Sequence, residues 1–186
     1  MKTVLIVEDE KMIRQGIKTM IMRSGVPIET IMECNNGETA LEILKEQEID
    51  VMFTDIRMPK MDGIELVQKM QSLEHIPLTV AISGYDDFAY AVEMLRNGVR
   101  EYILKPIERE KITEILKKLN AEIESRKEKE ENNQKIGYQQ MRHLMLSDEI
   151  SGEEQRTIES QYADHFYTGN YYVCCQNQVK RGELSD

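Results

Sequence analysis

The sequence predicts an α/β protein in which a parallel β-sheet carries helices on both faces. Short apolar runs typical of buried strands alternate five times with stretches whose apolar residues recur at helical spacing. Strands separated by helices in this way form parallel sheets with right-handed connections. Apolar residues make up 40% of the 186-residue chain and charged residues 31%, a composition that allows a packed core.

The predicted strands are short apolar runs, of which the second is the weakest. In chain order they span residues 4–7, 30–34, 51–54, 78–83 and 102–104. Continuous apolar runs of this length are typical of strands that are buried on both faces of a sheet. Function in such sheets gathers beyond the carboxyl ends of the strands, so the residues that follow each run are the candidates for a site.

Helical stripes of apolar residues separate the predicted strands. Phe88, Ala91, Val92 and Leu95 show the pattern at i, i+3, i+4 and i+7, and Gly98 supplies a stop signal. The other stripes span residues 13–21, 40–44, 66–73 and 112–123. The fifth of these helices is expected to extend beyond the sheet.

A change of composition follows the fifth stripe. Residues 124–135 include no apolar residue and mix charges of both signs. Such a stretch can be helical, but it cannot belong to a core. A single polar helix or a partly frayed linker is therefore favoured over a stable coiled coil.

The last part of the chain predicts two more elements. Residues 151–154 form a capping box that starts a helix, and residues 171–175 have the composition of a strand. A strand with no partner elements after it cannot stand alone. The sequence is therefore expected to be the front portion of a longer protein.

Charge and cysteine content restrict the class of protein. A net charge of −10 gives no global attraction to nucleic acid or to an anionic membrane. No apolar run approaches the roughly 18 residues of a membrane span, and the acids after residues 4–7 argue against a signal peptide. The chain has three cysteines, Cys34, Cys174 and Cys175, of which the last two are neighbours in the sequence. This number and spacing argue against a disulfide framework and fit a reducing cytosol, so a cytoplasmic location is expected.

Polar residues with complementary chemistry follow four of the strands. Glu8 and Asp9 follow the first, Asp55 the third, Ser83 ends the fourth, and Lys105 follows the fifth. Carboxylates that meet at one edge of a sheet repel one another, and a divalent cation removes this cost. Their hard oxygen ligands suit Mg²⁺. Asp55 then becomes a candidate nucleophile toward a phosphoryl group, with Lys105 and Ser83 as partners of the phosphoryl oxygens.

Each of these residues also has an ordinary structural explanation when it is taken singly. Asp9 has the position of a helix N-cap, and Asp55 precedes a turn. A single Lys105 before a proline is usually exposed, and a single Ser83 before a glycine usually belongs to a turn. Their joint occurrence at the ends of strands one, three, four and five favours a common site.

Residues 1–107 resemble the receiver domain of two-component response regulators. The matching stretches are VLIVEDE (4–10), FTDIRMPKMDG (53–63), AISG (81–84) and YILKP (102–106). The resemblance implies a doubly wound, flavodoxin-like sheet with strand order 2-1-3-4-5. It also implies a regulatory module that is not an enzyme, whose Asp55 receives a phosphoryl group from the phosphohistidine of a sensor histidine kinase.

The resemblance assigns further roles around Asp55. Mg²⁺ would be held by Asp9, Asp55 and the backbone carbonyl of Arg57, with Glu8 acting mainly through water. Glu8 stands where many receivers have aspartate, and this longer acid is an alternative within the family.

Three other residues are assigned to phosphoryl binding and switching. Lys105 and Ser83 would bind the phosphoryl group, and Tyr102 would be the aromatic switch that moves as Ser83 moves. Ser83 replaces the threonine of many receivers but keeps the hydroxyl. The Lys105–Pro106 peptide bond is expected to be cis.

A finer resemblance links the chain to receivers that are joined to an AraC-type pair of helix-turn-helix motifs. It is carried by GYDDFAYA (84–91) and GVREYILKPI (98–107). It implies a receiver core over 1–107, a fifth helix with a charged helical linker over 108–146, and the start of a middle region over 147–186. DNA binding would belong to further sequence, and a homodimer would form through the fourth helix, fifth strand and fifth helix or through the linker helix.

Three other classes compete with this interpretation. A phosphatase of the haloacid-dehalogenase type needs a second aspartate two residues after the nucleophile, where Arg57 stands. An FMN-binding protein of the flavodoxin type needs a small hydroxyl-rich loop after the first strand, where Glu8, Asp9 and Glu10 would repel phosphate. A pseudo-receiver that acts as an interaction or dimerisation module without phosphorylation remains open.

Overall fold

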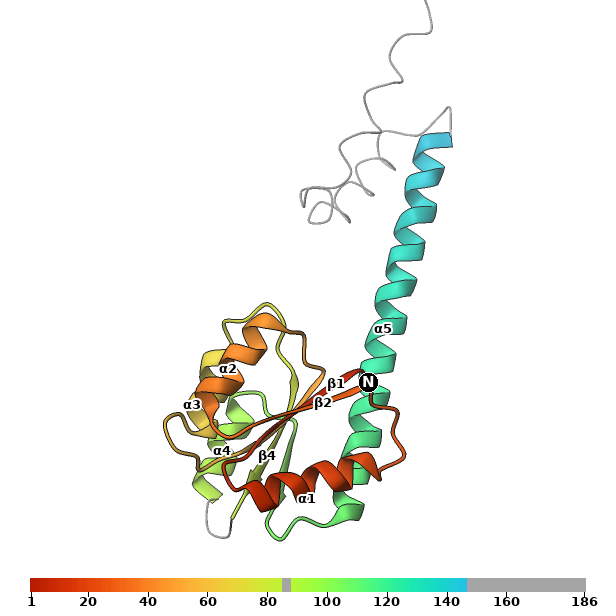
Figure 1. The fold of residues 1–186 in the computed structure, drawn as a ribbon. Helices are drawn as coiled ribbons and strands as arrows, with labels where there is room; N and C mark the ends of the chain where they lie inside the picture. The colour runs from red at the N-terminus through yellow and green to blue at the C-terminus, as the bar shows by residue number, and fades with distance from the viewer. Residues whose placement is uncertain (85–87, 147–186) are drawn as a thin grey trace, which may run out of the picture. The chain divides into compact units, whose positions relative to one another are not determined.

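A five-stranded parallel sheet forms the centre of the protein in a computed structural model that describes residues 1–84 and 88–146 (Figure 1). The strands are β1 (Thr3–Val7), β2 (Thr30–Cys34), β3 (Val51–Asp55), β4 (Leu78–Ser83) and β5 (Glu101–Leu104). Their order in the sheet is β2-β1-β3-β4-β5, and all four neighbouring pairs are parallel. This confirms the predicted α/β fold and strand order.

Five helices connect and follow the strands. They are α1 (Lys11–Met22), α2 (Gly37–Glu46), α3 (Gly63–Met70), α4 (Phe88–Arg96) and α5 (Arg109–Leu146). The weak apolar pattern of residues 30–34 has a physical reason, because β2 is an edge strand and four of its five residues are at least partly exposed. The central strands β3 and β4 are buried along their whole length.

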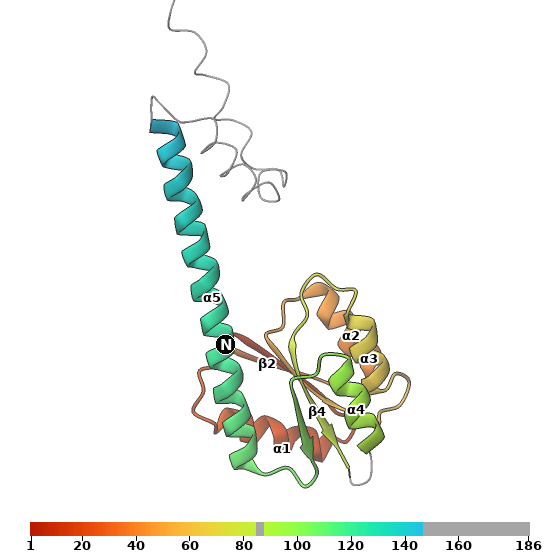
Figure 2. The same cartoon turned by 180° about the vertical axis from the view of Figure 1, so that it is seen from behind.

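The helices form two layers, one on each face of the sheet (Figures 1 and 2). Successive residues of a strand point to opposite faces. Thus Leu5 and Val7 of β1 belong to the core that α2, α3 and α4 cover, whereas Val4 and Ile6 belong to the core that α1 and α5 cover. The two cores hold the sheet from both faces. Because its strands are parallel, their carboxyl ends lie along one rim of the sheet.

Local signals in the sequence set the ends of several helices. The side chain of Asn36 accepts a hydrogen bond from the Thr39 amide at the start of α2, and Asp62 does the same for the Glu65 amide at the start of α3. Gly98 follows α4 with a φ of 83°, a conformation that favours glycine and that confirms the predicted stop.

The fifth helix is 38 residues long and has two different environments. Its first turns pack against the sheet through Ile112, Ile115, Leu116, Leu119 and Ile123. Residues 124–133 are exposed and still helical, so the predicted polar helix is present. The chain divides into the compact units Met1–Lys127 and Glu128–Asp186. The predicted elements at 151–154 and 171–175 lie outside the described residues.

A glycine lets α3 approach the carboxyl end of β3. A Cβ atom on Gly63 would lie 2.2 Å from the backbone oxygen of Asp55, far inside any normal contact. The Gly63 amide donates a 2.8 Å hydrogen bond to the carbonyl of Ile56. Gly37 at the start of α2 is packed in a similar way, because its Cβ would lie 2.7 Å from the carbonyl oxygen of Met61. These two contacts fix the loop that follows β3.

The Gly63 contact predicts an opposite response of two glycines to the same substitution. Gly63→Ala should destabilise the protein by about 1–3 kcal/mol or more, because the new methyl group meets backbone that cannot rotate away. Gly16→Ala should stabilise it by about 0.5–1 kcal/mol, because Gly16 lies inside α1 with nothing within 4 Å of its Cβ position. Urea unfolding of both variants measures the difference. Equal effects of the two substitutions would contradict the assigned contact.

Candidate functional site

The carboxyl ends of the strands bring the predicted site residues to one rim of the sheet. Val7 pairs with Thr54, so the residues that follow β1 lie beside the end of β3. Asp55 pairs with Ile82, which places it one residue from Ser83 along the neighbouring strand. Parallel pairing therefore gathers residues that are far apart in the sequence.

Three carboxylates form a compact acidic cluster at this rim. One oxygen from each of Glu8, Asp9 and Asp55 lies within 4.8 Å of the others. Glu8 and Asp55 are buried, and Asp9 is exposed. The cluster therefore has a closed inner side and an open outer side through which a small ligand can enter.

Lys105 is the cation that balances the cluster. Its Nζ lies 3.0 Å from Oδ2 of Asp55 and 3.0 Å from Oε2 of Glu8. Burial alone would lower the pKa of Lys105, but the close contacts and negative charges of Glu8 and Asp55 outweigh it and raise that pKa above its usual value. The ammonium group therefore stays charged. The backbone amide of Lys105 donates to the Ser83 carbonyl, and the Lys105–Pro106 bond is cis, as the sequence predicted.

The pKa of Glu8 is raised well above its ordinary value. Burial and, second, the negative charge of Asp55 raise its pKa from 4.5 to about 7, although Lys105 opposes the shift. Its Oε1 accepts a 3.3 Å hydrogen bond from the Glu10 amide. Its Oε2 contacts Lys105 as an ion pair but has no aligned hydrogen-bond donor among the described residues. The Lys105 ammonium is therefore the one described partner of this buried oxygen.

The donor set fits a hard divalent cation. All three clustered side chains offer carboxylate oxygens, and the underused Oε2 of Glu8 adds a buried acceptor. Oxygen ligands with room for water are what Mg²⁺ requires. The cluster therefore has the composition of a Mg²⁺-binding acidic pocket.

Asp55 is oriented by two hydrogen bonds, one to each oxygen. Oδ1 accepts from the Ile56 amide at 2.8 Å, and Oδ2 accepts from Lys105 Nζ at 3.0 Å. The carboxylate is therefore held in one orientation at the end of β3, close to the cluster and to a cation. This geometry suits a nucleophile that attacks a group carrying negative charge, since the cation compensates that charge.

The remaining predicted residues lie around this centre. Ser83 is buried at the end of β4, but its hydroxyl donates to the Gly84 carbonyl at 3.0 Å and, among the described contacts, not to the cluster. Tyr102 on β5 is partly buried against the core under α4, and its hydroxyl is buried without a hydrogen-bond partner among the described residues. Arg57 is exposed, and its guanidinium lies 5.6 Å from the ring centre of Tyr90 on α4.

Two residues shape the site through contacts that the sequence did not reveal, although one of them, Gly63, ends the FTDIRMPKMDG motif (53–63). Gly63 touches the backbone of Asp55, and Arg14 of α1 donates hydrogen bonds to the carbonyls of Glu8 and Asp9. Both contacts depend on the distance between elements, which periodicity does not reveal. The glycine ending the FTDIRMPKMDG motif was the nearest available hint.

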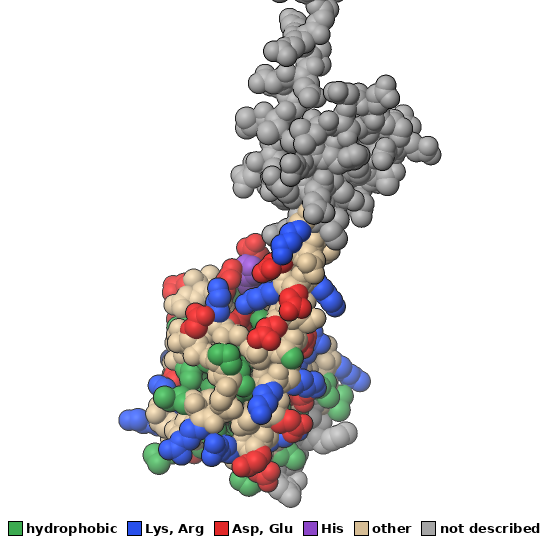
Figure 3. All heavy atoms as spheres, turned by 90° about the vertical axis from the view of Figure 1, so that its right-hand side faces the viewer, with side chains coloured by type: hydrophobic (Ala, Val, Ile, Leu, Met, Phe, Trp, Pro, Cys, Tyr) green, Lys and Arg blue, Asp and Glu red, His purple; other side chains and the backbone are tan. Residues whose placement is uncertain are grey.

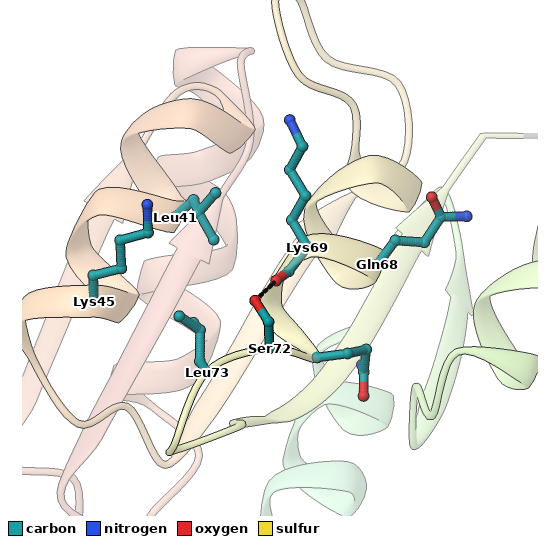
Figure 4. A pocket seen from close by; sticks show the side chains of 7 residues that line it. Leu41, Lys45, Gln68, Lys69, Ser72 and Leu73 are labelled. Atoms are coloured by element: carbon teal, nitrogen blue, oxygen red, sulfur yellow. Dashed lines mark hydrogen bonds between the residues drawn. The ribbon is translucent and has the colours of Figure 1, made fainter.

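A separate groove lies between α2 and α3 (Figure 4). Its volume is about 490 Å³. None of its lining residues belongs to the acidic cluster, so it plays no part in the site described above. The lining residues are Leu41, Lys45, Gln68, Lys69, Gln71, Ser72 and Leu73.

Family comparison agrees with the fold and the cluster. The family model of the response regulator receiver domain matches residues 4–117. The chain therefore belongs to the response regulator receiver domain family, a class of regulatory signalling modules that interact with histidine kinases.

Two curated relatives are transcriptional regulatory proteins. YesN of Bacillus subtilis is 31% identical over 123 residues, which are 66% of this chain and 33% of that protein. HptR of Staphylococcus aureus is 33% identical over 117 residues, which are 62% of this chain and 45% of that protein. The chain thus spans less than half the length of these relatives.

Solved structures show the same fold. The receiver domain of AraT, a response regulator from Geobacillus stearothermophilus, is 34% identical with a TM-score of 0.59 and covers 67% of this chain and 97% of its own. A two-component transcriptional regulator AraC from Clostridium phytofermentans is 32% identical with a TM-score of 0.61 and covers 69% of this chain and 99% of its own.

Within the described part of the chain, no helix combines the length and apolar character needed to cross a membrane.

The raised pKa of Glu8 predicts that the free energy of unfolding depends on pH and that Glu8→Gln removes this contribution. Because the pKa is raised on folding, the metal-free protein should lose stability as pH rises from 4.5 to about 7. Glu8→Gln lacks this titration, so its free energy of unfolding relative to wild type should rise by on the order of 3 kcal/mol across that window. Urea unfolding with a chelator measures this. Glu10→Gln, at the exposed neighbouring acid, is the control, and a Glu8→Gln curve parallel to wild type would contradict the assignment.

Proposed function

We propose that this chain is the phosphoacceptor part of a two-component response regulator, phosphorylated on Asp55 by a sensor histidine kinase. The observation that carries the proposal is the contact of Lys105 Nζ with both Asp55 and Glu8 at 3.0 Å, beside the three clustered carboxylates. A nucleophilic carboxylate, a fixed cation and oxygen ligands for a metal are the parts that phosphoryl transfer needs.

The proposed reaction follows from the position of Asp55. A carboxylate oxygen of Asp55 attacks the phosphorus, the bond between phosphorus and the imidazole nitrogen of the kinase breaks, and an acyl phosphate forms on Asp55. Lys105 would transfer its contact from the carboxylate to a phosphoryl oxygen. Ser83 would release its hydrogen bond to the Gly84 carbonyl and turn its hydroxyl toward another phosphoryl oxygen.

The metal ligands are proposed from the same cluster. Asp9, Asp55 and the backbone carbonyl of Arg57 would hold Mg²⁺, and Glu8 would act mainly through a bound water. When bound, the ion supplies positive charge that stabilises the phosphoryl oxygens and relieves the repulsion between the carboxylates. The buried Oε2 of Glu8 supports this assignment, because it lacks an aligned hydrogen-bond donor in the described structure.

The proposed output uses the surface of α4, β5 and α5. Movement of Ser83 would change the space available to Tyr102, whose ring packs under α4. The face that includes α5 carries basic and acidic side chains side by side (Figure 3). Within one chain, Arg100 pairs with Glu122 at 3.2 Å, and Lys118 pairs with Glu101. A homodimer through this face or through the linker helix would exchange such pairs between copies.

The domain organisation is proposed on the same basis. Residues 1–107 would be the receiver core, 108–146 the fifth helix and its charged helical linker, and 147–186 the beginning of a middle region. The transcriptional regulators YesN and HptR support an output on DNA, and the C. phytofermentans regulator supports an AraC-type output. DNA contact would then belong to an output domain outside these residues, in a cytoplasmic protein.

The assignment of Asp55 as phosphoacceptor predicts that phosphorylation adds mass to the wild-type protein but not to a variant without the Asp55 carboxylate. Wild-type protein treated with a small phosphodonor and Mg²⁺ should gain one phosphoryl group by intact mass, whereas Asp55→Asn should gain none. Asp62→Asn is the matched control, because Asp62 lies in the same loop and asparagine can still cap α3. Unchanged wild-type mass, or equal labelling of Asp55→Asn, would favour a pseudo-receiver that acts by interaction alone.

The ligand assignment predicts a difference between two neighbouring acids. Asp9→Ala should weaken Mg²⁺ binding by on the order of tenfold or more, because it removes one of the clustered oxygens. Glu10→Ala removes the same charge from the next residue, which is exposed and outside the cluster, and should change the affinity little. Titration calorimetry measures both. Undiminished affinity in Asp9→Ala would remove Asp9 from the site.

A further inference from the structure

The loop that carries Glu8 and Asp9 is held from α1 in an unusual way. Helix α1 begins at Lys11, and its N-cap residue Glu10 makes no side-chain capping hydrogen bond. Arg14, one turn further along the helix, reaches back instead. Its Nη1 donates to the carbonyl of Glu8 at 2.5 Å and to the carbonyl of Asp9 at 3.4 Å. One guanidinium therefore contacts the backbone of both acids of this loop.

Arg14 is itself fixed by Glu33 on the edge strand β2. Nε of Arg14 lies 3.6 Å from Oε2 of Glu33, and both side chains are mostly shielded from solvent. The same carboxylate accepts from Gln15 at 2.6 Å and pairs with Lys18 at 2.5 Å. Because Glu33 is held by three side chains of α1, it provides a rigid support for the guanidinium.

We propose that Arg14 is a positioning residue for the cation site. It fixes the backbone of Glu8 and Asp9 so that their carboxylates stay close enough to Asp55 to bind one divalent cation together. This inference rests on the proposed function, because it concerns the same acidic cluster, but it adds a residue that contacts no reacting group. A partner of this kind orients ligands and sets metal affinity without binding the metal.

The direction of the change in Mg²⁺ affinity distinguishes a positioning role of Arg14 from a purely electrostatic one. The Arg14 guanidinium is a positive charge beside the backbone of Glu8 and Asp9 and repels a divalent cation bound there, so its electrostatic effect alone predicts tighter Mg²⁺ binding when it is removed. Removing a support of the loop that carries Glu8 and Asp9 would instead weaken Mg²⁺ binding. Lys18 gives the matched comparison, because it carries the same charge and pairs with the same Glu33 but makes no described contact with the loop carbonyls.

The test is a Mg²⁺ titration of four proteins by calorimetry: wild type, Arg14→Met, Arg14→Lys and Lys18→Met. Arg14→Met should bind Mg²⁺ about tenfold more weakly. Arg14→Lys keeps the charge but loses the fork of donors, so its affinity should fall between those of wild type and Arg14→Met. Lys18→Met should bind as wild type or slightly more tightly. Equal affinity of Arg14→Met and Lys18→Met would overturn the positioning role.

A second measurement works without metal and without phosphorylation. Backbone amide shifts of Asp9 and Glu10 in metal-free protein should change in Arg14→Met and stay close to wild type in Lys18→Met. Unchanged shifts in Arg14→Met would overturn the inference even if wild type bound no Mg²⁺. Absence of Mg²⁺ binding by wild type, together with altered loop shifts in Arg14→Met, would instead remove the proposed function and leave the structural role of Arg14. Arg14→Lys serves as the test variant if Arg14→Met does not fold.

Discussion

The pairing of Lys105 with two carboxylates is the interaction on which the site depends. Glu8 and Asp55 are both buried, and burial of two like charges beside each other is unfavourable unless a cation compensates them. Lys105 lies 3.0 Å from both and provides part of that compensation. The compensation is incomplete, because burial and, second, the charge of Asp55 raise the pKa of Glu8 to about 7 even with the ammonium group present. The site is thus short of positive charge in the metal-free protein.

The fold holds these charged residues in place and leaves them little freedom to move. Parallel pairing of β1 with β3, and of β4 with β5, delivers the chain to one rim each time a strand ends. The loops beyond the strands are then restrained by specific contacts: Gly63 packs on the Asp55 backbone, and Arg14 bonds the Glu8 and Asp9 carbonyls. Rigid strands and short, bonded loops are what a preorganised charged site needs.

Much of this could be predicted from the sequence because it follows from topology. The alternation of strand and helix patterns predicted a parallel sheet, and a parallel sheet places Glu8, Asp55 and Lys105 at one edge whatever the details of packing. The strand order required the additional resemblance to a known family, since alternation alone does not order the strands. Three of the five strands begin or end one residue beyond the predicted run, as at β3, where the strand includes Asp55 itself.

Other features could not be predicted, because they depend on distances between elements. Nothing in the periodicity of α1 indicates that Arg14 turns back toward the loop, and Gly63 shows its constraint only when α3 is docked on β3. The hydroxyl of Ser83 is a further example, since its present partner is the Gly84 carbonyl. A sequence motif names the residues of a site, but packing decides which of their atoms are in contact.

The contacts of Lys105 also explain how a local change of charge can reach the surface. Its side chain is bound to Asp55, while its backbone amide is bound to the Ser83 carbonyl at 2.7 Å. Any new group on Asp55 that attracts the ammonium therefore acts on a residue already joined to the end of β4. Tyr102 lies three residues earlier on β5, with a buried hydroxyl that has no partner among the described residues, so no hydrogen bond there resists its displacement. Arg57, two residues after Asp55, has its guanidinium 5.6 Å from the ring centre of Tyr90 on α4. Contacts around Asp55 therefore extend to β4 through Lys105 and to α4 through Arg57.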